Sequence, residues 1–384
     1  MRDSAAFPAI AMPAAASGSR RGGRSACPHC GTRRPIHMLR RVSAVIFESN
    51  MHDARSGHGP PRVTRILAGA VSALCLLATA AAWALPPRRL MPAVFRADRV
   101  YLECAATHGG RLRLYTDTGG AMVVAAPALT RLGLQPQAPA DPAPRAQLVR
   151  GARVIAMRSL GLAAPIPLAH APMVVVPAMR QLSGWPLQGD GILGQAWFAG
   201  HVWTWNYPAG RLWLDSPGWT PAGARAVPLG FPVDAWGRRA DDFPHIVVRI
   251  DGSAVPLLLD TGAETYLTRA ALAQLRDGGP RLRATSMIIA TLFERWHREH
   301  PGWRVIRKAQ TGTGAAMIEV PRVRVAGLRV GPVWFTERPD ANFLKIMSSM
   351  TSAPVYGSLG GNALRDLRMT IDYPRALAWF TRGR

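Results

Sequence analysis

The stretch LLLDTGAETYLT, residues 257–268, runs from three leucines directly into an acid, Asp260. The apolar run is typical of a buried strand, and the Thr and Gly that follow are typical of a turn. An ionised carboxylate in apolar surroundings is costly unless it is paired, hydrogen-bonded or protonated. Asp260 therefore either caps a turn or takes part in chemistry.

A second copy of this motif lies in the first half of the chain. LRLYTDTGGAMVV, residues 112–124, is another apolar segment that ends in Asp-Thr-Gly, with Asp117 as its acid. Downstream of the acids are GILG at 191–194 and GSLG at 357–360, which lie 166 residues apart, and an Asn/Asp-Tyr-Pro tripeptide follows each at the same spacing. Independent turns would not keep this register, so the chain contains an internal repeat.

The second copy is longer than the first. Asp117 and Asp260 are only 143 residues apart, so the second half has 23 extra residues between its acid and its glycine motif. Residues 283–303 carry apolar side chains at helical spacing, and we place the insertion there as an amphipathic helix. Short helices are also expected soon after each acid, at 127–132 and at 269–275.

Most of the remaining sequence alternates with a period of two and predicts strands. We expect paired strands at 100–104 and 112–116 and at 246–250 and 255–259, and further hairpins at 148–157 and 309–320. A segment rich in Pro and Gly, 217–232, marks the seam between the halves. The sequence therefore predicts an all-β fold of two similar lobes, 95–225 and 226–384, related by a pseudo-twofold axis, with an inserted helix in the second lobe.

Two similar lobes can bring their acids together at the axis that relates them. Two carboxylates a few ångströms apart do not both ionise easily, so Asp117 and Asp260 are expected to share one proton. One acid can then deprotonate a water as it attacks an amide carbonyl, while the other stabilises the oxyanion. Glu264 follows Asp260 closely, but we expect it to point to the outer side of the loop and do not count it as a third catalytic acid.

The residues after each acid suit this arrangement. The hydroxyls of Thr118 and Thr261 can bond the opposite lobe, and Gly119 and Gly262 allow the backbone to approach the carboxylates closely. These four residues are predicted to support the loops that carry the acids.

LRLYTDTGG and LLLDTGAET, each followed by its glycine motif, resemble the retropepsin-like aspartic proteases, and the single chain resembles a bacterial two-lobe member with a fused pair of such domains. The resemblance covers residues 95–384. It implies retropepsin- or pepsin-like β-barrel lobes, catalytic Asp117 and Asp260, and a brace formed by Thr118 and Thr261. It also implies flaps that bind substrate, with tips near Gly151 and near Gly312, Thr313 and Gly314.

The sequence departs from this family at two positions. Gly120 replaces the usual small Ala or Ser, and Ser358 occupies an apolar position of the second glycine motif. We expect an aspartic endopeptidase acting on polypeptide; the alternative is a catalytically silent relative that binds an extended peptide in the same cleft.

The N-terminal segment indicates export. Residues 66–87 carry no charge, two arginines precede them, and Ala-Trp-Ala at 82–84 fits a signal cleavage site. We expect residues 51–84 to be a signal peptide and the protein to be periplasmic or secreted; the alternative is an anchor in the inner membrane through 66–87. Residues 1–50 are expected to be a disordered leader or an over-extended gene start.

The composition argues against nucleic-acid binding, a disulfide framework and a metal site. The net charge of +24 comes almost entirely from arginines scattered along the chain, so we attribute it to coding bias and expect no nucleic acid partner. Of the four cysteines only Cys104 lies beyond residue 84, so no disulfide framework is expected. Cys27 and Cys30 form half a zinc site at best. We expect no metal, no cofactor, and a monomer that acts as a pseudo-dimer.

Overall fold

The computed structural model describes residues 88–107, 109–138, 153–183 and 188–383. They belong to one compact unit, Leu85–Arg384. The predicted leader, the signal or anchor segment and the flap tip at Gly151 lie outside the described residues. Within the described part of the chain, no helix is both long enough and apolar enough to cross a membrane.

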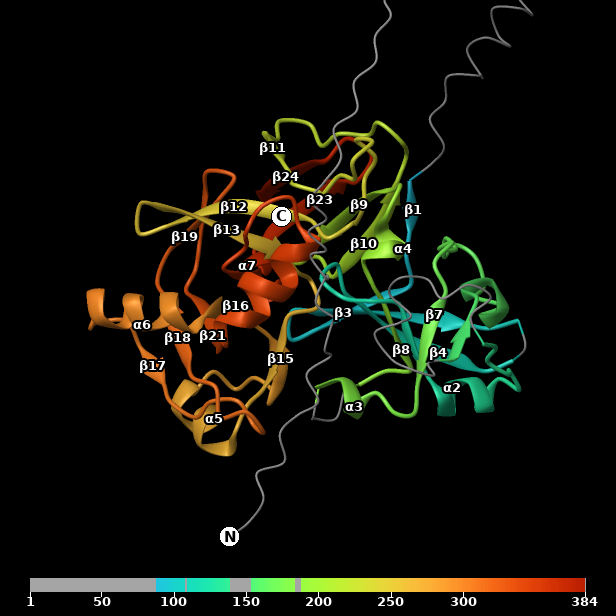
Figure 1. Ribbon diagram of the computed structural model, residues 1–384, viewed down its shortest axis with the longest axis horizontal. Helices are drawn as coiled ribbons and strands as arrows, with labels where there is room; N and C mark the ends of the chain where they lie inside the picture. The colour runs from blue at the N-terminus through green and yellow to red at the C-terminus, as the bar shows by residue number, and fades with distance from the viewer. Residues whose placement is uncertain (1–87, 108, 139–152, 184–187, 384) are drawn as a thin grey trace, which may run out of the picture. The chain divides into compact units, whose positions relative to one another are not determined.

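The first lobe contains a seven-stranded sheet (Figure 1). Its strands, in sheet order, are β2 (Ala93–Arg96), β3 (Arg99–Ala105), β4 (Arg111–Thr116), β8 (Gly191–Leu193), β5 (Val123–Ala125), β7 (Met173–Val176) and β6 (Arg153–Ile155). The helices are α2 (Ala126–Arg131), α3 (Arg180–Ser183) and α4 (Gln195–Phe198), with a 3₁₀ turn at Met157–Leu160. β3 pairs antiparallel with β4, which confirms the predicted hairpin, and consecutive residues of both strands are buried, so both faces of the sheet are covered here.

The second lobe repeats this order in a nine-stranded sheet. Its strands are β17 (Val305–Ile306), β18 (Met317–Val320), β21 (Val333–Arg338), β16 (Ser286–Ile289), β22 (Gly357–Leu359), β13 (Ser253–Leu259), β12 (His245–Ile250), β19 (Val323–Val325) and β20 (Leu328–Val330). β13 pairs in parallel with β22 as β4 does with β8. The strands next in order also match in direction, since β16 is antiparallel to β22 and parallel to β21, as β5 is to β8 and β7.

A six-stranded sheet joins the two halves. Its strands are β1 (Arg89–Leu90), β10 (Arg211–Asp215), β9 (Val202–Asn206), β23 (Leu367–Asp372), β24 (Leu377–Arg382) and β11 (Ala226–Pro228). At its centre β9 pairs with β23, and Thr204 faces Thr370 with their hydroxyls 2.7 Å apart. These two residues are 166 positions apart, which is the spacing of the repeat, so the pseudo-twofold axis passes between them. The predicted all-β fold of two similar lobes is confirmed.

The strand register places the insertion earlier than the sequence predicted. Met287 of β16 occupies the position of Val123 of β5, since each pairs with the second residue of its glycine motif. They are 164 residues apart, against 143 for the acids, so 21 of the 23 extra residues lie between Asp260 and β16. The inserted unit is β14 (Glu264–Tyr266), α5 (Arg269–Leu275) and β15 (Leu282–Ala284).

The helix predicted within 283–303 exists as α6 (Ala290–Glu299), with Leu292, Phe293 and Trp296 buried. It directly follows β16, as α2 follows β5, so α6 is the counterpart of α2 and the inserted helix is α5. Helical spacing indicates a helix but not its place in a repeat, which is why the insertion was misplaced. The remaining helices are α7 (Gly361–Leu364), a π-helical turn at Asn342–Ile346 and a 3₁₀ turn at Met347–Met350.

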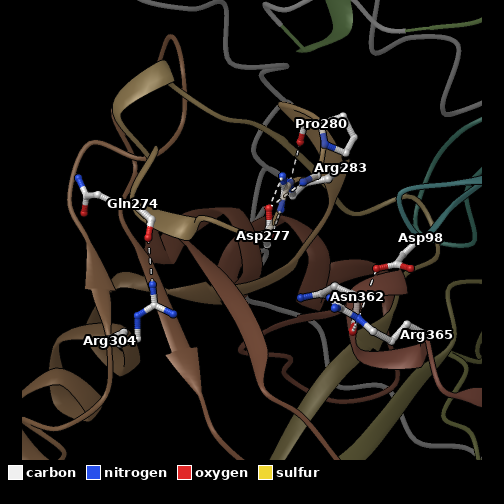
Figure 2. Close-up of polar contacts among 9 residues, drawn as sticks. Asp98, Gln274, Asp277, Pro280, Arg283, Arg304, Asn362 and Arg365 are labelled. Atoms are coloured by element: carbon white, nitrogen blue, oxygen red, sulfur yellow. Dashed lines mark hydrogen bonds and ion pairs between the residues drawn. The ribbon is translucent and has the colours of Figure 1, made fainter. Parts of the chain in front are cut away.

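Hydrogen bonds and an ion pair hold the inserted unit in place (Figure 2). Arg283 of β15 pairs with Asp277 and donates 2.7 Å to the carbonyl of Pro280, both in the turn before this strand, while Arg304 donates 3.2 Å to the carbonyl of Gln274 in α5. On the opposite edge, the amide of Ala284 donates 3.0 Å to the carbonyl of Ala97, which belongs to the turn between β2 and β3 of the first lobe. The insertion therefore takes part in joining the lobes.

A second contact reaches the same turn of the first lobe. Arg365, just after α7, lies 3.4 Å from the carboxylate of Asp98 and donates 2.9 Å to the carbonyl of Asn362 (Figure 2). A Cβ on Gly361 would lie 2.0 Å from the Asp98 carbonyl, so the close contact of the two lobes requires glycine there.

Candidate active site

Each acid follows the last residue of a strand and is fixed by the neighbouring strand. Asp117 follows β4, and its amide donates 2.9 Å to the carbonyl of Leu193 in β8. Asp260 follows β13, and its amide donates 3.0 Å to the carbonyl of Leu359 in β22. The two glycine motifs thus supply the same bond in both lobes, so the repeat found in the sequence corresponds to one structural unit used twice.

The threonines after the acids hold the lobes together at this point. Thr118 Oγ1 donates 2.6 Å to the carbonyl of Leu259 and accepts a bond of 2.9 Å from the amide of Thr261. In return, Thr261 Oγ1 donates 3.4 Å to the carbonyl of Thr116 and accepts a bond of 3.2 Å from the amide of Thr118. Both threonine side chains are fully buried. The brace expected from Thr118 and Thr261 is therefore present in the geometry.

The glycines bring the two acids together. A Cβ on Gly262 would lie 2.0 Å from Asp117 Cγ, and a Cβ on Gly119 would lie 2.6 Å from Asp260 Cγ. Each loop therefore packs its glycine against the carboxylate of the other lobe, which no side chain would permit. The amide of each glycine also donates to the acid of its own loop, at 2.9 Å from Gly119 to Asp117 and 3.0 Å from Gly262 to Asp260.

The two carboxyl groups are electrostatically unequal. Burial raises the pKa of Asp117 well above its usual range, and the charge of Asp260 raises it further. Burial raises the pKa of Asp260 as well, although the Asp117 carboxyl, the Gly262 amide and the nearby Ser358 hydroxyl each act to lower it. The two acids therefore titrate as a pair and are expected to hold one proton between them.

The surroundings of Asp117 include a residue that the sequence placed wrongly. Glu264 does not point outward: it is 6% exposed and forms an ion pair of 3.4 Å with Arg99 of the first lobe, which is 2% exposed. Its charge also raises the pKa of Asp117. Arg99 in turn bonds the hydroxyl of Tyr101, which packs on Tyr115 with ring centroids 5.0 Å apart. A strand of three residues, β14, turns Glu264 inward, and the partner that accounts for this lies 165 residues away.

The surroundings of Asp260 differ. Ser358 replaces the apolar residue of the first glycine motif, and its buried hydroxyl lies close enough to Asp260 to lower the pKa of that acid. Arg338 at the end of β21 is half-buried, and the charge of Asp260 acts on its pKa. It donates 2.8 Å to the side-chain oxygen of Gln310. Nothing in the local sequence around Arg338 indicated a role.

Of the two predicted flap tips, only the second is described. Gly312, Thr313 and Gly314 form a turn in which both glycines have positive φ, 87° and 70°. The inserted unit holds this turn, because the amide of Thr311 donates 2.8 Å to the carbonyl of Tyr266 in β14. The second-lobe turn is thus anchored at its base.

Gly120, which departs from the family pattern, fits its position. A Cβ there would lie 2.2 Å from Asp117 Oδ2, so the first loop has no room for the alanine that stands at Ala263 in the second. The described residues contain no cluster of three or more His, Cys, Asp or Glu side chains suited to a metal ion. Cys27 and Cys30 lie outside these residues.

Comparison with known proteins finds a likeness in structure but not in sequence. No protein family model and no curated protein matches the sequence. Among solved structures, the chain is similar to the aspartic proteinase from Irpex lacteus. The identity is 8%, the TM-score is 0.41, and the match covers 77% of this chain and 98% of that chain. The function of this chain is therefore inferred from its own residues and their geometry.

Proposed function

We propose that this protein is an aspartic endopeptidase that hydrolyses peptide bonds in polypeptides by means of a water held between Asp117 and Asp260. The observation that carries the proposal is the crossed packing of the two loops. Each Asp-Thr-Gly glycine lies against the acid of the other lobe, and the reciprocal threonine bonds hold that arrangement. Buried carboxylates placed in this way have a chemical use and no evident structural one.

The surroundings of the two acids favour Asp260 as the base, because the Ser358 hydroxyl lies near it, and Asp117 as the acid, because the Glu264 carboxylate acts on it. Asp260, ionised, takes a proton from water as the water oxygen attacks the amide carbonyl carbon. Asp117, protonated, gives its proton to the carbonyl oxygen, which yields a neutral geminal diol. Asp260 then passes its proton to the amide nitrogen, the C–N bond breaks, and a hydroxyl proton of the diol returns to Asp117. The products are a carboxylic acid and an amine, and both acids regain their starting states.

The test uses the full chain and three variants. Asp117→Asn and Asp260→Asn each remove one member of the pair, and we expect either to lower cleavage of a denatured protein substrate by about 10²- to 10⁴-fold. Asp366→Asn is the matched control, because Asp366 is exposed on the second lobe. Wild-type activity in either of the first two variants would refute the proposal.

Cleavage should be assayed from acidic to neutral pH. If the wild-type chain cleaves at no pH yet still binds peptide, the catalytically silent alternative replaces the proposal. Thermal unfolding of all four proteins shows whether a loss of activity reflects a loss of folding.

A further inference from the structure

The strand register places Arg338 on the same face of the second-lobe sheet as the acid Asp260. Ser358 of β22 pairs with Met287 of β16, which pairs with Thr336 of β21. Paired residues point to the same face of a sheet, and so do residues two apart on a strand. Arg338 therefore shares the face of Ser358, whose hydroxyl acts on Asp260.

The corresponding position in the first lobe is apolar. By the same register, Val176 of β7 is the counterpart of Arg338, because Val174 pairs with Val123 as Thr336 pairs with Met287. Val176 packs against a cluster of Tyr101, Tyr115, Val123, Ala125, Met179 and Ile192. Equivalent positions in the two lobes thus hold different side chains: Val176 in the lobe of Asp117 is apolar, and Arg338 in the lobe of Asp260 is a cation.

Arg338 has donors to spare. One of its terminal nitrogens, Nη1, bonds the side-chain oxygen of Gln310 at 2.8 Å and the carbonyl of Glu337 at 2.9 Å, and no described carboxylate forms an ion pair with it. Burial lowers its pKa to about 10, so it stays charged at neutral pH. Gln310 is 1% exposed, and its Nε2 has no partner among the described residues. A guanidinium and an unpaired amide side by side suit a carboxylate, which accepts several bonds at once.

We propose that Arg338 and Gln310 form a subsite for an acidic side chain of the substrate next to the scissile bond. This inference rests on the proposed function and names its substrate class. In its working state the acid pair carries one negative charge and repels a second carboxylate in the cleft. Arg338 offsets this repulsion on the Asp260 side.

The test compares peptides that are identical except for Glu or Gln next to the scissile bond. We expect the wild-type chain to cleave the Glu peptide with a kcat/KM about tenfold or more above that of the Gln peptide. Arg338→Gln should abolish this preference, and Arg338→Lys should keep part of it, because lysine retains the charge but not the planar fork. Arg329→Gln, on the exposed edge strand β20, is the matched control and should leave the preference intact.

Two outcomes would overturn the subsite. One is a wild-type chain indifferent to Glu and Gln at either flank. The other is an Arg338→Gln variant that loses activity equally on both peptides, since Arg338 would then only hold the Gln310 loop in place. Either result leaves the peptidase proposal standing as long as Asp117→Asn and Asp260→Asn abolish cleavage.

Binding gives a readout that does not need turnover. The full chain carrying Asp260→Asn should bind the Glu peptide more tightly than the Gln peptide, and adding Arg338→Gln should remove the difference. Equal affinities before that second change would overturn the subsite even if the chain cleaves nothing.

Discussion

The loops around Asp117 and Asp260 share a backbone and differ in what surrounds it. Both acids follow a strand, bond a leucine carbonyl of the glycine motif, and face the glycine of the other lobe. Asp117, however, lies near Glu264 and Tyr115, whereas Asp260 lies near Ser358 and Arg338. The repeated backbone brings the acids together, and the divergent side chains give each acid a different electrostatic environment.

The strongest test of this comparison makes the two loops alike. Gly120→Ala gives the first loop the residue that the second has at Ala263, yet we expect it to lower kcat by about 10²-fold, because the new Cβ would lie 2.2 Å from Asp117 Oδ2 and must displace that carboxylate. Gly262→Ala, with its Cβ 2.0 Å from Asp117 Cγ, should lower kcat at least as much.

The matched control is Ala263→Gly, which gives the second loop the glycine that the first loop has at Gly120. It removes one buried methyl group and should leave kcat within a few-fold of wild type. Unfolding temperatures separate lost chemistry from lost folding. A Gly120→Ala variant with full activity would show that the two loops tolerate the same residue and that their difference is incidental.

Glu264 offers the second test, because the residue at the same distance from the acid of the first loop is Ala121. The charge of Glu264 raises the pKa of Asp117, and Glu264→Gln removes that charge and leaves the buried Arg99 without its carboxylate. The loss of the Glu264 charge lowers the pKa of Asp117. The protonated acid is then lost at lower pH, so the alkaline limb of the pH–rate profile should move to lower pH while the acid limb moves less.

The same change should also lower the free energy of unfolding, by about 3–5 kcal/mol, since it breaks a buried pair and leaves one buried charge uncompensated. The double variant Arg99→Met with Glu264→Gln is the control: it should regain stability but keep part of the pH shift. If the alkaline limb is unchanged in Glu264→Gln, then Glu264 of the second lobe does not affect the pKa of Asp117.

The sequence predicted the fold and the pair of acids better than it predicted the residues that change the pKa values of the acids. The two-lobe fold could be predicted from local signals that both copies share. These are the Asp-Thr-Gly motifs, the glycine motifs GILG and GSLG, and the alternation of apolar and polar residues. The insertion was misplaced because α6 and α5 both look like helices, and only pairing between distant strands shows which one has a counterpart. Glu264 was misjudged and Arg338 was missed for the same reason, since the residues that they contact lie 165 and 28 positions away in the sequence.

The smallest expected difference lies within the threonine brace. Thr118 Oγ1 makes bonds of 2.6 and 2.9 Å, whereas those of Thr261 Oγ1 are 3.4 and 3.2 Å, so the brace is stronger on the Thr118 side. Replacing either by Val keeps the shape and leaves buried backbone groups without a partner. We expect Thr118→Val to lower the free energy of unfolding by about 1–3 kcal/mol and Thr261→Val by less.

Denaturant unfolding measures both, with Thr130→Val on the exposed side of α2 as a control that should stay within about 0.5 kcal/mol of wild type. Because the two hydroxyls bond each other's loop, their effects should not add: the double variant should lose less than the sum of the singles. Equal single losses that add in full would mean that each threonine supports only its own partner carbonyl. The loops would then be held by two separate bonds, and the unequal bond lengths would have no bearing on how the lobes are joined.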